Sequence, residues 1–259
     1  MRVVGGSSQA LFAAAFGLSS TLSDGDRSTA VEANAAPLHV ELVGLAGVGK
    51  THLKHRLLDH LGNRCLDIMT LRPRIRHLPF LPAAVWRVAP LVLHVTSASP
   101  RRWVTLSGTL RRLMVYSWRE LAALRAWPRP EFVLSEEGWF HKLRRLRRFM
   151  RPGTTYADLP VLVSTRLFRP DLVVFLTVDP LTACARKLQR WGVRVTPEEL
   201  VKQYERSAAL GQWEEDDLTR IDLDQASAAV GLRYVELNYT EDLDLLEGLI
   251  PILEGLRGQ

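Results

Sequence analysis

The chain has 259 residues, a length that favours one folded domain, and 47% of them are hydrophobic and 24% charged, values that exclude a disordered protein. Cys65 and Cys184 lie far apart without zinc-site spacing, which fits neither a disulfide framework nor a structural zinc site and favours the reducing cytoplasm. The net charge of +6 is segregated, because 72–151 holds 17 Lys and Arg against four Glu, whereas 195–259 holds five against 15 Asp and Glu.

This basic middle would suit nucleotides, nucleic acid, anionic lipid or a phosphorylated substrate. Alternatively, it forms a solvated face that the acidic tail balances across the fold.

Residues 1–36 are dominated by Gly, Ser, Ala and Asp. The apolar stretch at 10–18 is similar to a signal-peptide core, and Arg2 is the only positively charged side chain before this stretch. The segment that is similar to a cleavage site, at 33–36, follows the stretch too late. We expect a weakly ordered extension at 1–36 and a folded domain at 37–259. The apolar segment 78–95 contains three prolines and an arginine and is a poor membrane span.

The apolar run LHVELV at 38–43 predicts a buried strand, and the leucine spacing after Lys50 predicts a helix that ends at Gly62. Between them, GLAGVGKT at 44–51 satisfies the phosphate-loop pattern GxxxxGK[ST] in the required strand, loop and helix context. The expected nucleotide-binding residues are Gly44, Leu45, Ala46, Gly47, Val48, Gly49, Lys50, Thr51 and His52.

The chemistry of polyphosphate explains this pattern. Backbone N–H groups must approach the phosphates closely at a helix N-terminus, which requires glycines in the loop. Lys50 is expected to reach the β- and γ-phosphates, and the Thr51 hydroxyl to bind Mg²⁺. The pattern therefore predicts ATP and Mg²⁺ as cofactors.

The segment 72–130 is predicted to be mostly helical, because apolar residues recur at spacings of three and four until Trp127-Pro128. Further buried strands are predicted at 131–138, 171–180 and 232–237. Strands that alternate with helices predict an α/β protein with a three-layer α/β/α P-loop NTPase fold, a mostly parallel sheet and a helical insertion.

After the third strand, Asp179 is expected to cap a helix that begins at Pro180. The expected inward stripe of this helix is Leu181, Cys184, Leu188 and Trp191.

Two more helices are marked by their ends. Thr196 and Glu199 are spaced as a capping box. Thr240 is expected to open the last helix, and Pro251 to kink or divide it.

The segment RPDLVVFLTVDPLTACARKLQRWG at 169–192 resembles the corresponding stretch of thymidylate-kinase-like proteins within the nucleoside and nucleotide kinase superfamily. With the phosphate loop and the second strand, the resemblance spans about 38–206. It implies that Arg186 and Arg190 belong to a lid whose arginines neutralise charge on the transferring phosphoryl group, with Arg194 a weaker candidate. Phosphoryl transfer depends on positioning and charge stabilisation, which gives such a pair a physical use. The alternative is two solvated helix arginines.

The second strand ends in Ser135-Glu136-Glu137-Gly138. In the family that the chain resembles, an acidic residue here is followed by arginine, whereas this chain has Glu137 and so departs from the family's usual binding of an acceptor monophosphate. Glu136 is the first carboxylate beyond the apolar strand, so we expect it to hold magnesium-bound water or to accept a hydroxyl proton. Glu137 is the alternative carboxylate, and capping of the next helix is the alternative role.

The segment HKLRRLRRFMR at 141–151 predicts a basic amphipathic helix. Its commonest role is a surface helix with a charged outer face; the alternatives are an acceptor-pocket lining or contact with anionic lipid or an acidic partner. No guanine-specific, protein-kinase or RNA-binding motif is evident, so no specific nucleic acid is expected. The sequence leaves the oligomeric state open.

Together these features predict a P-loop kinase that passes the γ-phosphoryl group of ATP to a small acceptor, with catalytic residues Lys50, Glu136, Arg186 and Arg190 and metal contacts at Thr51 and Glu136. The acceptor is a small molecule with a hydroxyl or phosphate group, which the resemblance implies to be a nucleoside or nucleotide. The alternative is a nucleotide-dependent regulatory ATPase or binding module that engages a protein or membrane.

Overall fold

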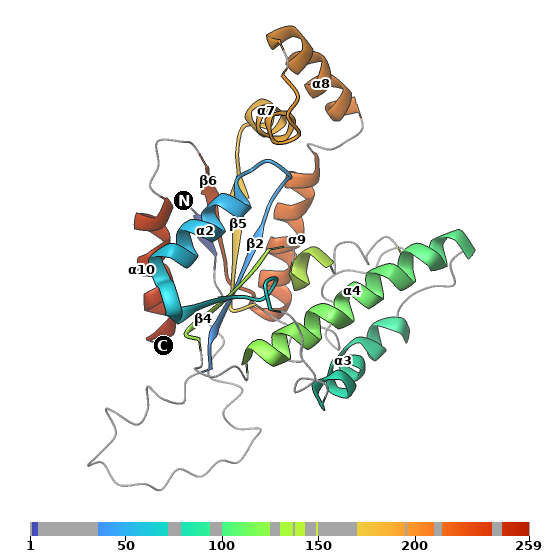
Figure 1. Cartoon of the computed structure of the whole chain (residues 1–259), viewed down its shortest axis with the longest axis vertical. Coiled ribbons are helices and arrows are strands. Elements are labelled where there is room, and N and C mark those ends of the chain that lie inside the picture. Colours follow the sequence, from blue (N-terminus) through green and yellow to red (C-terminus); the bar gives the residue numbers. More distant parts are fainter. Residues whose placement is uncertain are drawn as a thin grey trace, which may run out of the picture.

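The computed structural model of the chain describes residues 2–4, 36–71, 79–93, 100–124, 130–136, 138–142, 149, 170–194, 196–209, 214–239 and 245–258 (Figure 1). None of the helices within these ranges is both long and apolar enough to cross a membrane.

The strands form one six-stranded sheet in the order β1-β6-β5-β2-β4-β3 (Figure 1). They are β1 (Arg2–Val4), β2 (Leu38–Val43), β3 (Cys65–Asp67), β4 (Phe132–Glu136), β5 (Leu172–Thr177) and β6 (Tyr234–Asn238). Strands β2 to β6 are parallel, and β1 pairs antiparallel with β6 at the edge. The central strand of the parallel set is β2, so the residues that follow it lie at the middle of the sheet.

The described helices are α2 (Lys50–Leu61), α3 (Leu81–Leu93), α4 (Pro100–Leu124), α7 (Pro180–Arg190), α8 (Pro197–Ala209), α9 (Glu214–Val230) and α10 (Leu245–Arg257), and the 3₁₀ turn η1 is Gly62–Arg64. Leucines of α2 and α10 pack on one face of the sheet with Val174, whereas leucines of α4 and α9 pack on the other with Phe175. Because successive strand residues point to opposite faces, both faces are buried. The predicted three-layer α/β/α fold is confirmed.

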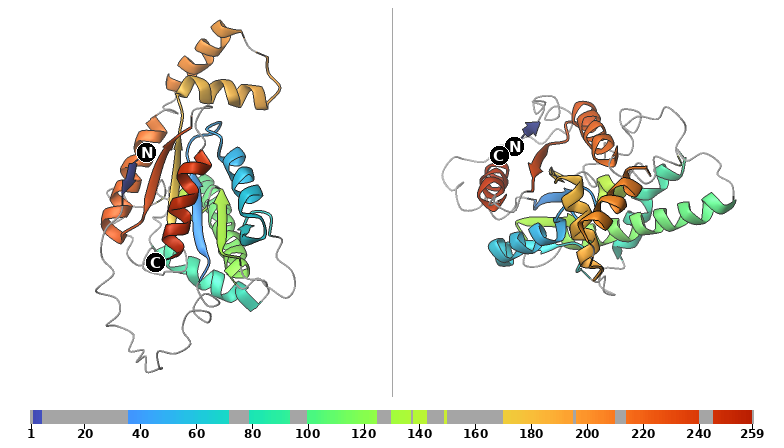
Figure 2. Two further views of the ribbon diagram at one scale, coloured as in Figure 1. Left: turned by 90° about the vertical axis from the view of Figure 1, so that its left-hand side faces the viewer. Right: turned by 90° about the horizontal axis from the view of Figure 1, so that it is seen from above.

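The helical insertion consists of α3 and α4, which pack against each other. Helices α7 and α8 lie beyond one end of the strands (Figures 1 and 2). This is the end at which β2 leads into the phosphate loop, because Gly47 of the loop lies against the backbone of Ala183 in α7.

Most sequence-based boundaries agree with the structure. The strand at 38–43 is confirmed residue for residue, and the capping box is confirmed by Thr196 N–H donating to Glu199 Oε2 at 2.9 Å. Asp179 caps α7 by accepting the Thr182 N–H at 2.9 Å. Strand β3 was not predicted, since three residues are too few to show a periodic pattern.

The predicted inward stripe of α7 is wrong at both of its ends. Leu181 is 37% exposed and Trp191 is 63% exposed, whereas the buried residues of α7 are Ala183, Cys184 and Leu188. The physical reason is that α7 lies beyond the ends of the strands (Figure 2), where it meets the phosphate loop at Ala183 and packs with α8 rather than on the sheet.

Pro251 does not divide the last helix, since α10 continues from Leu245 to Arg257. A proline removes one helical hydrogen bond, and Leu249 and Leu253, both fully buried, hold the helix to the sheet on either side of it. Thr240, Trp127 and Pro128 lie outside the described residues. Within the expected N-terminal extension, residues 2–4 form β1, and 5–35 lie outside the described residues.

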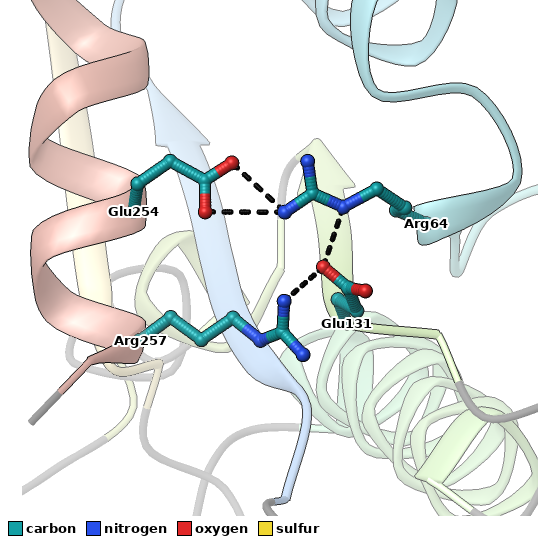
Figure 3. Close-up of polar contacts among 4 residues, drawn as sticks. All are labelled: Arg64, Glu131, Glu254 and Arg257. Carbon is teal, nitrogen blue, oxygen red and sulfur yellow. Dashed lines mark hydrogen bonds and ion pairs between the residues drawn. The ribbon is translucent and has the colours of Figure 1, made fainter. Parts of the chain in front are cut away.

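An ion-pair cluster joins η1, the start of β4 and α10 (Figure 3). Arg64 Nε donates to Glu131 Oε2 at 2.5 Å, and Arg64 Nη2 donates to Glu254 Oε1 at 2.8 Å. Arg257 Nη1 also donates to Glu131 Oε2. Glu131 thus holds two arginines at the end of the sheet opposite to the phosphate loop, where it has a structural role.

We expect Glu131→Gln to lower the free energy of unfolding by about 1 kcal/mol, because this half-exposed network loses its central negative charge. Urea unfolding at low and high salt measures the effect, and the difference from wild type should shrink in high salt. Nucleotide affinity should not change. A loss that is independent of salt would contradict the electrostatic explanation.

Candidate active site

The loop between β2 and α2 has a backbone that favours glycine. Gly47 has φ 94° and Gly49 has φ 101°, both in the left-handed region. A Cβ at Gly47 would lie 2.4 Å from the Ala183 carbonyl oxygen, and one at Gly49 would lie 2.7 Å from the Tyr239 ring. These positions therefore require both the conformational freedom and the small size of glycine.

The start of α2 has no side-chain cap. Gly49 occupies the N-cap position and has no side chain with which to cap the N–H groups of the first turn. The first N–H groups of a helix have no carbonyl partner within the helix, and the helix dipole favours an anion there. This loop and helix start thus have the chemistry of a phosphate site.

The ammonium group of Lys50 lies over the same loop. Its Nζ donates to the carbonyl oxygens of Gly44 at 2.6 Å and Leu45 at 2.7 Å. Both acceptors are main-chain atoms of the loop, so these bonds hold the ammonium at the loop, where an anion would sit.

A chain of polar contacts connects α2 with the ends of β4 and β3. Thr51 Oγ1 donates to Glu136 Oε1 at 2.6 Å, and Lys54 Nζ lies 2.9 Å from Glu136 Oε2. The same Nζ lies 2.9 Å from Asp67 Oδ2. The side chains of Lys54 and Asp67 are buried, so this ion-paired chain is well shielded from solvent.

Glu136 is held in its ionised form. Partial burial opposes ionisation, but the hydrogen bond from Thr51 and the ammonium of Lys54 outweigh it and keep the pKa of Glu136 below its ordinary value. Burial likewise opposes the charge of Lys54, yet its bonds to Glu136 and Asp67 raise its pKa. A carboxylate with a lowered pKa is better suited to a cation than to taking up a proton.

This lowered pKa predicts a pH-dependent stability. Because the folded pKa of Glu136 lies below the ordinary 4.5, its stabilising effect is fully present above about pH 4.5 and is lost as pH falls through the folded value. The difference in unfolding free energy between wild type and Glu136→Gln should therefore be constant from pH 7 to 5 and shrink below pH 4.5. Urea unfolding across this range measures it, and a difference that persists at pH 3 would contradict the assignment.

The oxygens of Thr51 and Glu136 fit a magnesium ion. A hydroxyl and a carboxylate are the hard donors that Mg²⁺ prefers, and the ion is usually shared with substrate phosphates and water. Their separation of 2.6 Å places both next to the phosphate loop. Within the part of the chain that the structure describes, no group of three His, Cys, Asp or Glu side chains is arranged to hold a metal.

The two expected lid arginines have different surroundings. The Arg186 guanidinium lies 4.9 Å from the centroid of the Tyr239 ring, which packs against Gly49 of the loop. The Tyr239 hydroxyl lies 2.5 Å from His52 Nδ1. Arg190 is exposed near the end of α7. The structure thus brings Arg186, but not Arg190, to the rim of the phosphate loop, and a lid role stays a prediction for both.

A cavity of about 580 Å³ lies beside α4, between the residues after β3 and the helical turn at 139–142. Its lining includes Met69, Tyr116 and His141. Four cationic side chains also line it: Arg111, Arg112, Arg119 and Lys142. Met69 N–H donates to Asp67 Oδ1 at 2.8 Å, so this cavity adjoins the chain of contacts that ends at Thr51.

Buried polar residues fix the walls of this cavity. Glu41 of β2 accepts the N–H groups of Phe140 at 2.9 Å and His141 at 3.1 Å, which anchors the turn at 139–142. His39 Nε2 lies 3.0 Å from the Tyr116 hydroxyl of α4. Burial opposes the charge of His39, but the nearby Glu120 raises its pKa. These contacts hold α4 and the turn against the sheet.

Several of these residues were missed by the sequence reasoning. Lys54 and Asp67 carry no motif of their own, and Tyr239 follows a strand whose end the sequence did not mark. The sequence offered one indication for Asp67, because this carboxylate follows the apolar residues Cys65 and Leu66. A segment of three residues is too short to identify a strand. Glu137 lies outside the described residues, and of the basic segment 141–151 only residues 141, 142 and 149 are described.

The chain is similar at low identity to several solved structures, whereas no protein-family model and no curated protein matches it. Deoxyadenosine kinase from M. mycoides with bound dATP matches at 14% identity and a TM-score of 0.39, over 85% of this chain and 99% of that one. The same enzyme with bound dCTP matches at 15% and 0.41, over 86% and 100%. TT1252 from Thermus thermophilus matches at 17% and 0.39, over 86% and 99%. The fold assignment rests on the strand order and phosphate loop of the chain itself.

Proposed function

We propose that this protein is an ATP-dependent phosphotransferase that passes the γ-phosphoryl group to a small acceptor with the help of Mg²⁺. The observation that carries this proposal is the unbroken set of contacts from Thr51 through Glu136 and Lys54 to Asp67. These contacts join the phosphate loop to the neighbouring cavity. The phosphoryl donor and the small-molecule acceptor would therefore lie at the two ends of one rigid chain of charged side chains.

In this proposal the amides of residues 44–51 hold the triphosphate, and Lys50 moves its ammonium from the loop carbonyls to the β- and γ-phosphates. Thr51 and Glu136 would hold magnesium, which supplies charge neutralisation on the phosphate oxygens when bound. Arg186 lies close enough to the loop to add a further positive charge. Little covalent chemistry is asked of the protein, because phosphoryl transfer depends mainly on position and charge.

The acceptor would occupy the cavity beside α4. Asp67 is a carboxylate next to that cavity, through its contact with Met69, and is ion-paired to Lys54, whereas Glu136 lies next to Thr51. This division supports a cation-holding role for Glu136 and leaves Asp67 as the candidate to orient or deprotonate an acceptor hydroxyl. A nucleoside or nucleotide is the acceptor that the sequence resemblance implies.

The test is a panel of small metabolites screened for acceptor-stimulated release of ADP from Mg·ATP. A phosphotransferase should release ADP much faster with the right acceptor and form a phosphorylated product. A regulatory ATPase, the alternative function, should ignore every small acceptor and instead change its affinity for a protein or membrane with the bound nucleotide. Absence of any Mg·ATP affinity would contradict both.

A further inference from the structure

The cavity beside α4 is strongly cationic. Arg112, Tyr116 and Arg119 lie at spacings of four and three on one face of α4, which directs their side chains to the same side. Arg111 lines the cavity next to this row, and Lys142 lines it from the turn at 139–142. None of the described residues that line it is an Asp or Glu.

Arg119 has hydrogen-bonding capacity that the surrounding residues do not use. Its Nε is buried and donates no hydrogen bond to any part of the chain that the structure describes. Its Nη1 lies 3.5 Å from the Met69 carbonyl oxygen, beyond the usual range of an N–H···O bond. A buried donor without an acceptor costs free energy, and a guanidinium is shaped to pair with a carboxylate or phosphate through two parallel bonds.

Apolar side chains form another part of the cavity wall, which Thr109 and His141 also line. Met69, Val115 and the Tyr116 ring contribute to its wall, and Lys142 Nζ lies 4.3 Å from the centroid of that ring. Such a wall favours a ligand with a flat or apolar body, because the body can pack on the ring while its charged group meets the arginines.

We propose that the acceptor is an anion, with a phosphate or carboxylate group bound by Arg119 together with Arg111 and Arg112, which line the same cavity, and an apolar or planar body against Tyr116. This inference rests on the proposed function, since it assigns the substrate class of the same site. In the family that the chain resembles, an arginine follows the acidic residue, whereas this chain has Glu137 after Glu136. The arginines of the cavity would supply the positive charge for the acceptor instead.

Matched pairs of probes test the proposal directly. Each pair consists of an uncharged compound and its anionic counterpart: nucleosides and their 5′-monophosphates, sugars and sugar phosphates, and aromatic amides and the corresponding carboxylates. Affinity is measured by calorimetry with the phosphate loop saturated by Mg·ADP, so that the probe reports on the cavity. The phosphate and carboxylate pairs distinguish the two anionic groups.

We expect the anionic member of at least one pair to bind at least about tenfold more tightly than its uncharged counterpart, as a charge-assisted contact requires. Arg119→Gln should remove that preference and leave Mg·ADP affinity unchanged. Arg119→Lys keeps the charge but loses the paired bonds, so its preference for the anionic probe should lie between those of wild type and Arg119→Gln. Arg206→Gln, at an exposed position of α8, is the matched control and should have no effect. If Arg119→Gln does not fold, Arg112→Gln provides the second variant.

Equal affinity for charged and uncharged members, no anionic probe bound at millimolar concentration, or full preference retained in Arg119→Gln would each overturn the inference. These outcomes are distinct from failure of the proposed function. An enzyme that phosphorylates uncharged acceptors equally well would retain that function, whereas a chain without affinity for Mg·ADP or Mg·ATP would lose it.

Discussion

Lys50→Ala is expected to abolish nucleotide-dependent activity, with a fall of at least about a hundredfold in kcat/KM for ATP. The ammonium lies within 2.7 Å of two carbonyl oxygens of the phosphate loop, so it is placed to meet the β- and γ-phosphates of the proposed complex. An alanine removes the two bonds to the loop carbonyls but none of the buried residues by which α2 packs. The loss should therefore appear in Mg·ATP affinity by calorimetry and in ADP release, while the melting temperature changes little.

Lys202→Ala in α8 is the matched control, because it removes a lysine from an exposed helical position. This variant should keep wild-type affinity and activity. If Lys50→Ala bound Mg·ATP as tightly as wild type, the assignment of residues 44–51 as the triphosphate site would be wrong. The variant tests the nucleotide site and not the acceptor, since a kinase and a regulatory ATPase both need it.

Glu136→Gln is expected to keep Mg·ATP affinity within about threefold but to lower the rate of transfer by on the order of a hundredfold or more. The amide oxygen of glutamine can still accept the bond from Thr51, so the shape of the site is retained. What is lost is the negative charge beside Thr51, and Lys54 then has Asp67 as its remaining carboxylate. A higher Mg²⁺ requirement in the variant would identify the lost charge as part of the magnesium site.

Glu205→Gln, at an exposed position of α8, controls for the loss of one carboxylate, and Asp67→Asn tests the other end of the chain of contacts. Full transfer activity in Glu136→Gln would show that our assignment of this residue is wrong. A strong loss in Asp67→Asn together with a pH profile that lacks its acidic limb would place the proton-accepting carboxylate on β3.

The phosphate loop could be predicted from the sequence because all of its parts are contiguous. The strand at 38–43, the glycines and the helix after Lys50 follow one another, and backbone geometry alone brings them to the same place. Glu136 could also be predicted, since it is the carboxylate at the C-terminal end of a strand parallel to β2. Parallel strands end at the same edge of a sheet, so its position next to the loop follows from topology.

The orientation of α7 could not be predicted in this way. Its residues show an amphipathic spacing, but the face that is buried depends on what the helix meets beyond the ends of the strands. There the neighbour is the phosphate loop at Gly47, so Ala183 is buried, whereas Leu181 and Trp191 are exposed. The spacing of apolar residues shows which face of a helix is apolar, but it does not show which other part of the chain that face contacts.

The sequence by itself determined the fold class, the position of the phosphate loop and the end of the sheet where the candidate site lies, because these depend on local patterns and on the rules of parallel sheets. Only the tertiary structure decided that Lys54 joins Glu136 to Asp67, that Tyr239 contacts both Arg186 and the loop, and that three arginines of α4 line a cavity beside this site. These residues come from separate crossovers of the chain, and no local pattern specifies which side chains meet when the strands are laid side by side.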